Sequence, residues 1–487
     1  MNETQKKRAI SAFTISNIMA GMEGTIIATA LPSMMADLHG IQLMAWVIAS
    51  YMLTMAISSP IWTKLAERFG HKQIFITGTA IFVLSSLMEG LSISMPMLIF
   101  ARLLMGIGSG AMLQIPFVIY GLLLKPDERR KAFGNATGGY SIAAAVGPLI
   151  GGLIVSALGW RWVFFINIPI GLFMIYQIAK NFHFEREHKV VKIDYFGSIF
   201  LSSATIFLMI ALQFMGSINP NWTMIISFIV LSIVLYTGLI LVERKVAEPI
   251  IPLELFRNRS FMMKNLLMFL QYGFFGFYTN YLPTWGQGSL GLTAFMGGLI
   301  LVPGSVTLFL SSRLVNPVLG KLGKNAERKL TTIGLSLMVL GDLILILLPQ
   351  HTSMIWLMIG GAILGTSTGL TNGVVQVAVQ ESVEKKFIGA ATALNALIRT
   401  LGTTLILSAL SVSLNLTFSN AVHKNHHLTI NLINQISDST AIKNIASNLI
   451  EPLRHVMYNG LHGLALIGIF ILLFAIAANY IDPWKKA

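Results

Sequence analysis

Apolar stretches long enough to cross a lipid bilayer fill nearly the whole chain, and no other feature limits the fold as strongly. A transmembrane helix needs about 20 consecutive, mostly apolar residues. Hydrophobic residues make up 54% of the 487 residues and charged ones 11%, unlike a soluble protein. We predict an all-α polytopic membrane protein with about fourteen transmembrane helices. They are expected at residues 9–31, 44–62, 73–91, 97–121, 135–158, 162–180, 194–215, 222–242, 262–284, 294–313, 329–349, 354–379, 388–414 and 458–481.

The positive charges alternate between the two sides of the predicted membrane. Most of the 34 Lys and Arg residues lie in the tails and in every second gap between the apolar stretches, at 6–8, 64–72, 125–131, 180–192, 244–259, 313–329, 385–386 and 485–486. Because basic loops stay in the cytoplasm, both termini are predicted to be cytoplasmic. The net charge of +14 then reflects topology, so we expect the lipid bilayer as a partner and no nucleic acid.

The sequence lacks the residues on which several classes of protein function depend. The chain has no cysteine, which excludes disulfides and thiol chemistry. It has no HExxH pair, no clustered metal ligands in a span and no phosphate-binding GxxxxGK[ST] loop. We therefore expect no metal, no cofactor and no enzyme activity, although a membrane-embedded enzyme stays a remote alternative. The first apolar stretch has no cleavage site and should be kept as a helix. The Lys-, Asn- and Ile-rich loops suggest a bacterial source.

The chain is predicted to contain two bundles of about six helices each. An amino-terminal bundle covers 1–185, a linking pair of helices covers 186–260, and a carboxy-terminal bundle covers 261–487. A weak repeat supports the division, because 63–72 (TKLAERFGHK) and 320–329 (GKLGKNAERK) follow matching spans. Parallel repeats with a site between the halves are a known plan of membrane transporters. An outer segment at 417–457 is either a lid or surface helix, or a poorly ordered loop.

Short segments in a fixed order along the chain carry a family resemblance. They are 22–32 (MEGTIIATALP), 63–72, 102–110 (RLLMGIGSG), 147–152 (GPLIGG), 160–169 (WRWVFFINIP) and 248–256 (EPIIPLELF). This set resembles the major facilitator superfamily and, within it, the fourteen-helix drug:proton antiporter family. The chain departs from the usual pattern at Thr63 (usually Gly), at Glu23 and Glu67 (usually Asp) and at His71 (usually Arg).

The resemblance implies which residues control the change of conformation. In 63–72, a carboxylate and nearby cations would latch two helices in one state. In 147–152, small residues allow close helix packing and a proline permits a bend; ordinary packing is the alternative. The residues assigned to gating are Lys64, Glu67, Arg68, Gly70, Lys72, Gly147, Pro148 and Gly151.

Ionisable residues within spans are costly and usually functional. Glu23 lies roughly 12 Å below the outer end of the first span, and Arg102 lies at a similar depth in the fourth, so the two are predicted to interact. We assign proton coupling to Glu23, Arg102 and Asp342; a structural ion pair is the alternative for the first two and packing for the third. Glu89 is expected to be solvated near the outer end of the third span. Arg399 is expected to pair with a carboxylate or to bind an anionic substrate group.

The ninth span is rich in aromatic residues, and the resemblance implies that it lines a substrate cavity. Aromatic faces bind flat or cationic molecules without strict geometry. Contact with lipid or with neighbouring helices is the alternative for any single ring. The cavity candidates are Gln114, Gln271, Tyr272, Tyr278, Asn280, Tyr281 and Arg399.

These expectations lead to one function and one close alternative. The first is a proton-coupled antiporter, acting as a monomer in the bacterial cell membrane, that exports drug-like or lipophilic, often cationic, compounds by alternating access. The second is a dedicated exporter of one metabolite, such as a siderophore, lipid or sugar derivative, on the same scaffold.

Overall fold

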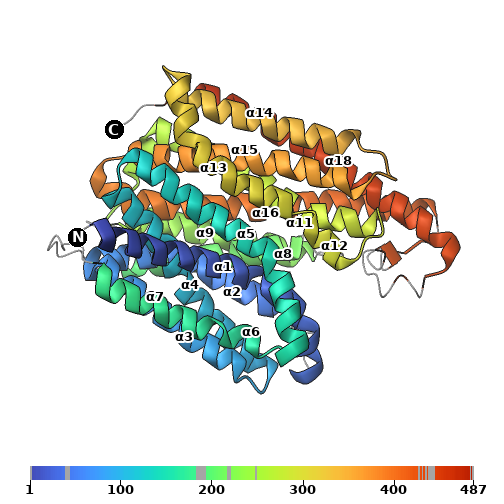
Figure 1. Cartoon of the computed structure of the whole chain (residues 1–487), viewed down its shortest axis with the longest axis horizontal. Helices are drawn as coiled ribbons and strands as arrows, with labels where there is room; N and C mark the ends of the chain where they lie inside the picture. The colour runs from blue at the N-terminus through green and yellow to red at the C-terminus, as the bar shows by residue number, and fades with distance from the viewer. Residues whose placement is uncertain are drawn as a thin grey trace.

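The computed structural model describes residues 3–38, 44–182, 194–215, 221–246, 249–425 and 445–482, with short pieces at 428–429, 432–433, 436, 442 and 484. Within these residues all regular structure is helical (Figure 1). Helices α1 (Glu3–Leu38) and α18 (Ser447–Ile481) respectively begin and end at the same end of the molecule, which we call the base.

The amino-terminal helices form one bundle (Figure 1). Helix α1 packs on α5, while α4 packs on α2 and α3 and α7 packs on α3. Ser94 caps α4 by accepting a hydrogen bond from the Met97 amide. Gly70 joins α2 to α3 with φ 97°, a conformation that favours glycine. The further helices are α2 (Met44–Phe69), α3 (His71–Gly90), α4 (Met95–Leu123), α5 (Pro126–Leu158), α6 (Trp162–Phe165) and α7 (Asn167–Asn181).

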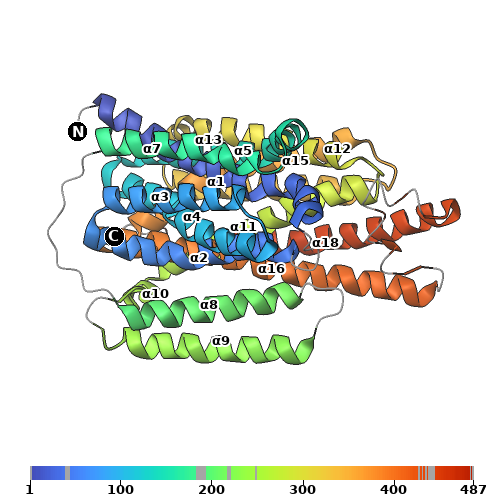
Figure 2. The same cartoon turned by 90° about the horizontal axis from the view of Figure 1, so that it is seen from below.

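Two further helices, α8 (Tyr195–Met215) and α9 (Trp222–Glu243), run side by side along one edge of the molecule (Figure 2). They pack mainly on each other, and the Ser232 hydroxyl donates to the Ala204 carbonyl across the pair at 2.8 Å. Helix α8 also contacts α2 and α16. This pair therefore lies against both bundles rather than between them.

The carboxy-terminal helices form the second bundle. Helix α11 packs on α16 and α18, and α15 packs on α13 and α14. Asn258 caps α11 by accepting from the Phe261 amide. The helices are α10 (Glu254–Arg257), α11 (Arg259–Gly288), α12 (Ala294–Leu299), α13 (Val302–Leu322), α14 (Ala326–Leu347), α15 (Met354–Glu381), α16 (Ile388–Lys424) and α18, with a 3₁₀ turn at Lys385–Phe387.

The two bundles meet through α5 with α13 and through α2 with α16. Toward the base, Arg130 Nη1 lies 3.2 Å from Glu327 Oε1, and Arg130 Nε donates to Asn316 at 2.9 Å. The Gln380 amide donates to the Phe117 carbonyl at 3.2 Å. These contacts hold the bundles together at the base. Glu327 belongs to the second copy of the predicted repeat.

Ten of the described helices are long and apolar enough to cross a membrane, or eleven if α5 counts as one bent span. The protein is therefore a multi-pass membrane protein. The other expected spans are also helical in the structure, as α2, α8 and α11.

Two expected spans contain a local interruption, and the outer segment differs from the prediction. Residues Trp162–Asn181 and Met296–Leu322 each form one span of sufficient length and hydropathy. The first is interrupted at Ile166 between α6 and α7, and the second between α12 and α13, where Pro303 lies in the first turn of α13. Proline favours the first turn of a helix. The expected outer segment at 417–457 is shorter than predicted, because α16 continues to Lys424 and α18 begins at Ser447. Most of 426–444 lies outside the described residues.

Candidate functional site

A cavity of about 460 Å³ lies between the two bundles, within the usual size range of ligand sites. Both bundles contribute to its wall, through α1, α2, α4 and α5 on one side and α11, α13, α15 and α16 on the other. The wall combines apolar and aromatic side chains with amides and hydroxyls, among them Met52, Met55, Leu113, Phe117, Tyr140, Phe275, Asn372, Thr400 and Thr403. Such a surface suits an amphipathic small molecule.

Most of the predicted cavity residues line this space. They are Gln114, Gln271, Tyr272, Tyr278, Asn280 and Arg399. Tyr281 does not, because its hydroxyl is 2.7 Å from Ser411 Oγ and ties α11 to α16. Phe274 and Phe277 also lie outside the wall and pack in the core of the carboxy-terminal bundle. Whether an aromatic ring of α11 reaches the cavity therefore depends on the side of the helix on which it lies, and not on how many aromatic residues the helix contains.

Arg399 is held at the cavity wall by neutral groups. Its Nη1 donates to the Tyr272 hydroxyl at 2.9 Å, and its guanidinium lies 4.8 Å from the centre of the Tyr272 ring. Asn372 also bonds the same hydroxyl, with its Nδ2 at 2.8 Å. The predicted carboxylate partner of Arg399 is not found among the described residues.

A sealed ionic cluster lies in the amino-terminal bundle next to the cavity. Arg102 Nη1 is 2.6 Å from Glu23 Oε1, and both side chains are only 1% exposed. Arg102 Nε also donates to the Val47 carbonyl at 2.9 Å, and its guanidinium lies 4.4 Å from the centre of the Tyr51 ring. The predicted approach of Glu23 and Arg102 is thus found, one residue away from Gly24 in the cavity wall.

Asn167 completes this cluster, and sequence reasoning missed it. Its Nδ2 donates to Glu23 Oε2 at 2.9 Å and lies 3.0 Å from Ser86 Oγ. Asn167 is the first residue of α7, just after the break at Ile166. The signal was present in the WRWVFFINIP segment, where an amide sits inside an otherwise apolar stretch.

The expectation for Glu89 was wrong. Glu89 is 0% exposed, and its Oε1 lies 3.8 Å from Arg102 Nη1. Neither carboxyl oxygen has a hydrogen-bond partner among the described residues. The Phe165 ring lies against Gly90 at the end of α3, next to Glu89. Two carboxyl groups therefore face one guanidinium.

Asp342 is buried but lies away from the cavity wall. Its oxygens have no hydrogen-bond partner among the described residues, and Asp342 is near Gly468 and Phe274, between α14, α18 and α11. A second buried ion pair was missed: Lys264 Nζ lies 3.1 Å from Asp482 Oδ2, with both side chains 2% exposed. This ion pair connects the start of α11 to the end of α18. Sequence reasoning missed Lys264 because it lies within the long, mostly apolar stretch that forms α11.

The predicted gating residues gather at the base and along α5. Lys64 pairs with Glu67 at 3.2 Å, and Lys72 Nζ donates to the Ala179 carbonyl at 2.6 Å. A Cβ added at Gly389, in the opposite bundle, would lie 2.5 Å from Glu67 Oε1. Arg68 lies over the Phe69 ring, 5.2 Å from its centre.

Helix α5 carries the remaining gating residues. Its axis bends by 46° between Ala144 and Leu149, the stretch that contains Gly147 and Pro148. A Cβ at Gly147 would clash with Thr25 Oγ1 of α1, so glycine favours this close approach of α5 to α1. Gly151 is buried one turn further along. The bend lies where the sequence predicts it.

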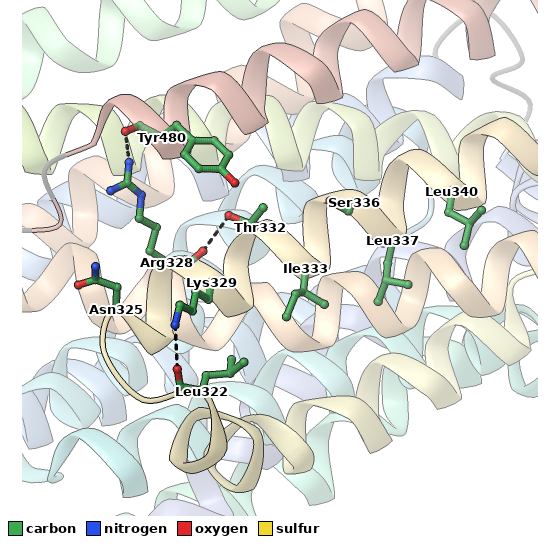
Figure 3. A pocket seen from close by; sticks show the side chains of 10 residues that line it. All are labelled: Leu322, Asn325, Arg328, Lys329, Thr332, Ile333, Ser336, Leu337, Leu340 and Tyr480. Atoms are coloured by element: carbon green, nitrogen blue, oxygen red, sulfur yellow. Dashed lines mark hydrogen bonds between the residues drawn. The ribbon is translucent and has the colours of Figure 1, made fainter.

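A separate pocket of about 770 Å³ lies at the surface of the carboxy-terminal bundle. It is lined by α14, the end of α13 and Tyr480 of α18 (Figure 3). Arg328 donates to the Tyr480 carbonyl, and Lys329 Nζ donates to the Leu322 carbonyl at 3.1 Å. None of the predicted site residues lines it. The cavity between the bundles is therefore the better candidate for a substrate site.

Comparisons with known proteins agree with this architecture. Residues 13–407 match the Major Facilitator Superfamily. Multidrug resistance protein 3 of Bacillus subtilis (strain 168) is 32% identical over 414 residues, which are 83% of this chain and 80% of that protein. The multidrug efflux pump SdrM of Staphylococcus aureus (strain N315) is 30% identical over 299 residues, 61% of this chain and 66% of that pump.

A solved structure shares the fold. The human organic anion transporter MFSD10 superposes with a TM-score of 0.63 at 11% identity, covering 97% of this chain and 100% of that one. From the family match over most of the sequence, the identity to these bacterial relatives and the shared fold, it follows that the chain belongs to the Major Facilitator Superfamily.

Proposed function

We propose that this protein is a proton-coupled antiporter that exports drug-like, lipophilic compounds by alternating access. The observation that carries the proposal is the sealed Glu23–Arg102 ion pair beside a cavity between two bundles. The printed names of its bacterial relatives, a multidrug resistance protein and a multidrug efflux pump, support efflux of such compounds. The mixed apolar and polar wall of the cavity fits molecules of this class.

Proton binding at Glu23 is the proposed coupling step. A buried ion pair is stable only while both charges are present. When an external proton binds Glu23, the carboxyl group becomes neutral and Arg102 loses its counter-charge. The guanidinium then shifts from Glu23 toward Glu89, which it already approaches to 3.8 Å. This exchange of partners moves α1 and α3 relative to α4, and it links proton uptake to the shape of the cavity.

The contacts at the base are the ones that must break for the cavity to face the cytoplasm. We propose the Lys64–Glu67 segment against α16 and the Arg130–Glu327 pair as two latches, one from each copy of the repeat. The bend in α5 serves as a hinge. Asp342 ranks below Glu23 as a coupling residue, because it has no arginine partner among the described residues, whereas Glu23 is paired with Arg102.

The membrane arrangement belongs to the same proposal. We place about fourteen spans across a bacterial cell membrane, with the base and both termini in the cytoplasm. The three-part division at 1–185, 186–260 and 261–487 follows the bundles and the α8–α9 pair. The protein acts as a monomer without a cofactor, and the proton gradient supplies about 2.3 kcal/mol per charge for each 100 mV of potential.

The test is proton release in inverted membrane vesicles that contain wild type or Glu23→Gln. We expect a panel of lipophilic drugs to collapse the pH gradient in wild-type vesicles and not in the variant. The Glu128→Gln variant, at an exposed carboxylate near Lys6 at the base, is the control and should match wild type. Drug-dependent collapse that persists in Glu23→Gln would refute the coupling role.

A dedicated exporter of one metabolite is the second candidate. It is favoured by a single observation, the cationic Arg399 in the cavity wall. A response of the vesicles to one acidic metabolite, and to none of the drugs, would select it.

A further inference from the structure

Arg399 is the only charged side chain among the described residues that line the central cavity. No Asp, Glu, Lys or His from the described part of the chain contributes to the wall. The amino-terminal half of the wall is neutral and consists of apolar, hydroxyl and amide groups. Any charge preference of the cavity itself must therefore come from α16, on which Arg399, Thr400 and Thr403 occupy one face.

The charge of Arg399 is not neutralised from within the described part of the protein. Its partners are the Tyr272 hydroxyl and ring, and Tyr272 is in turn bonded to Asn372. Its Nε is buried and has no hydrogen-bond partner. A partly buried cation without a counter-charge is energetically unfavourable. An anion that enters the cavity is therefore stabilised more strongly by Arg399 than by an arginine that is surrounded by water.

The other arginine near the cavity is not available for this purpose. Arg102 is 1% exposed and its charge is taken by Glu23 at 2.6 Å. Arg399 is instead only partly buried and lies in the cavity wall without a carboxylate partner among the described residues. Guanidinium groups bind carboxylates through two parallel N–H···O bonds, and the remaining donors of Arg399 suit that geometry.

The surroundings define the rest of the ligand. Phe275, Tyr278, Phe117 and Met55 offer apolar and aromatic surface in the same cavity. Asn280 and Thr400 add polar groups to the same wall. We propose that Arg399 forms an anion-recognising subsite, so that the preferred substrates are aromatic or apolar molecules that carry a carboxylate. The substrate part of this proposal rests on the proposed function; the subsite itself does not.

The experiment measures binding to purified protein by calorimetry and requires no transport. The probes are 2-naphthoate and 2-naphthamide, which share one ring system and differ in charge. We expect wild type to bind the carboxylate about tenfold more tightly or better. Arg399→Gln should remove this preference and leave the affinity for the amide unchanged, whereas Arg399→Lys should keep part of it because the positive charge remains.

The control variant is Lys324→Gln, which removes an exposed positive charge in the loop between α13 and α14. It should keep the full preference. Equal binding of both probes to wild type, or a preference that survives in Arg399→Gln, would overturn the subsite. If Arg399→Gln binds neither probe, the retained preference of Arg399→Lys supports the proposal and its loss counts against it. Failure of the vesicle test with intact carboxylate preference would reject proton coupling alone.

Discussion

Two arginines near the centre of the molecule differ in how their charge is compensated. Arg102 is sealed between α1, α3 and α4, with Glu23 at 2.6 Å and Glu89 at 3.8 Å. Arg399 stands in the cavity wall and has only neutral partners, the nearest being the Tyr272 hydroxyl. The same side chain therefore occupies two settings: in the closed cluster we propose that it takes part in proton coupling, and in the open wall that it recognises a ligand.

The largest expected effect comes from removing the sealed arginine. Arg102→Ala leaves two buried carboxyl groups without a counter-charge, and breaking a buried pair costs about 3–5 kcal/mol. We expect a large drop in thermal stability in detergent and loss of transport. Arg399→Ala is the matched comparison and should cost less, since no ion pair is broken and the loss is mainly one hydrogen bond to a charged group, about 1.5–3 kcal/mol at the upper limit. Similar melting temperatures for both variants would contradict the distinction between the two sites.

Glu89→Gln tests whether the cluster exchanges partners. Glutamine keeps the shape of the side chain but cannot take over the guanidinium as an anion. We expect drug-dependent proton release to slow by about tenfold, equivalent to about 1.4 kcal/mol in the barrier, with binding of 2-naphthoate unchanged. Ser92→Ala removes a hydroxyl that donates to the Glu89 carbonyl just after the end of α3 and leaves the Glu89 carboxyl group in place, so it serves as a control for local packing. Wild-type turnover in Glu89→Gln would show that Arg102 never needs a second carboxylate.

Tyr272→Phe sharpens the other side of the comparison. It removes the hydroxyl that holds Arg399 Nη1 and Asn372 but keeps the aromatic ring. Losing one hydrogen bond to a charged group costs about 1.5–3 kcal/mol at most, and the ring contact remains. We expect a loss of a few fold in 2-naphthoate affinity and little change for 2-naphthamide. An equal loss for both probes would mean that Tyr272 acts on the ring of the ligand and not through Arg399.

Asp342→Asn should have the smallest effect on coupling. Asp342 lies between α14 and α18, and its environment contains no guanidinium partner among the described residues. Asparagine has nearly the same volume and carries no charge, so we expect proton release within about twofold of wild type (about 0.4 kcal/mol). If proton release were abolished while the melting temperature stayed like that of wild type, Asp342 would be a second coupling residue. Proton coupling would then not depend on the Glu23 cluster alone.

Several particulars of the site could be predicted from the sequence because they depend on depth and helix geometry. Glu23 and Arg102 were placed at similar depths in spans that line the cavity, and the structure joins them. The aromatic and amide residues of the ninth span were predicted to line the cavity, and Gln271, Tyr272, Tyr278 and Asn280 do so. Helical rise gives the depths of Glu23 and Arg102, whereas the family resemblance supplied the expectation that these spans line the cavity.

Other features of the site depended on helix rotation and packing, which no periodic pattern contains. Tyr281 faces α16 because α11 is turned so that its neighbours on the helix, and not Tyr281, meet the cavity. Glu89 is buried although it lies near the outer end of its span, and the Phe165 ring packs beside it against Gly90. Asn167, the first residue of α7, donates its amide to Glu23 across the bundle.

The sequence by itself determined that the chain is a helical membrane protein, where most of its spans lie and which residue types face one another by depth. These properties follow from the cost of placing polar groups in lipid, which acts on every residue separately. The tertiary structure alone decided how each charge is compensated: Arg102 by carboxylates in a closed cluster, Arg399 by neutral groups in an open wall. Compensation depends on distances of a few ångströms between helices far apart in the chain, and only the packing of the bundles sets those distances.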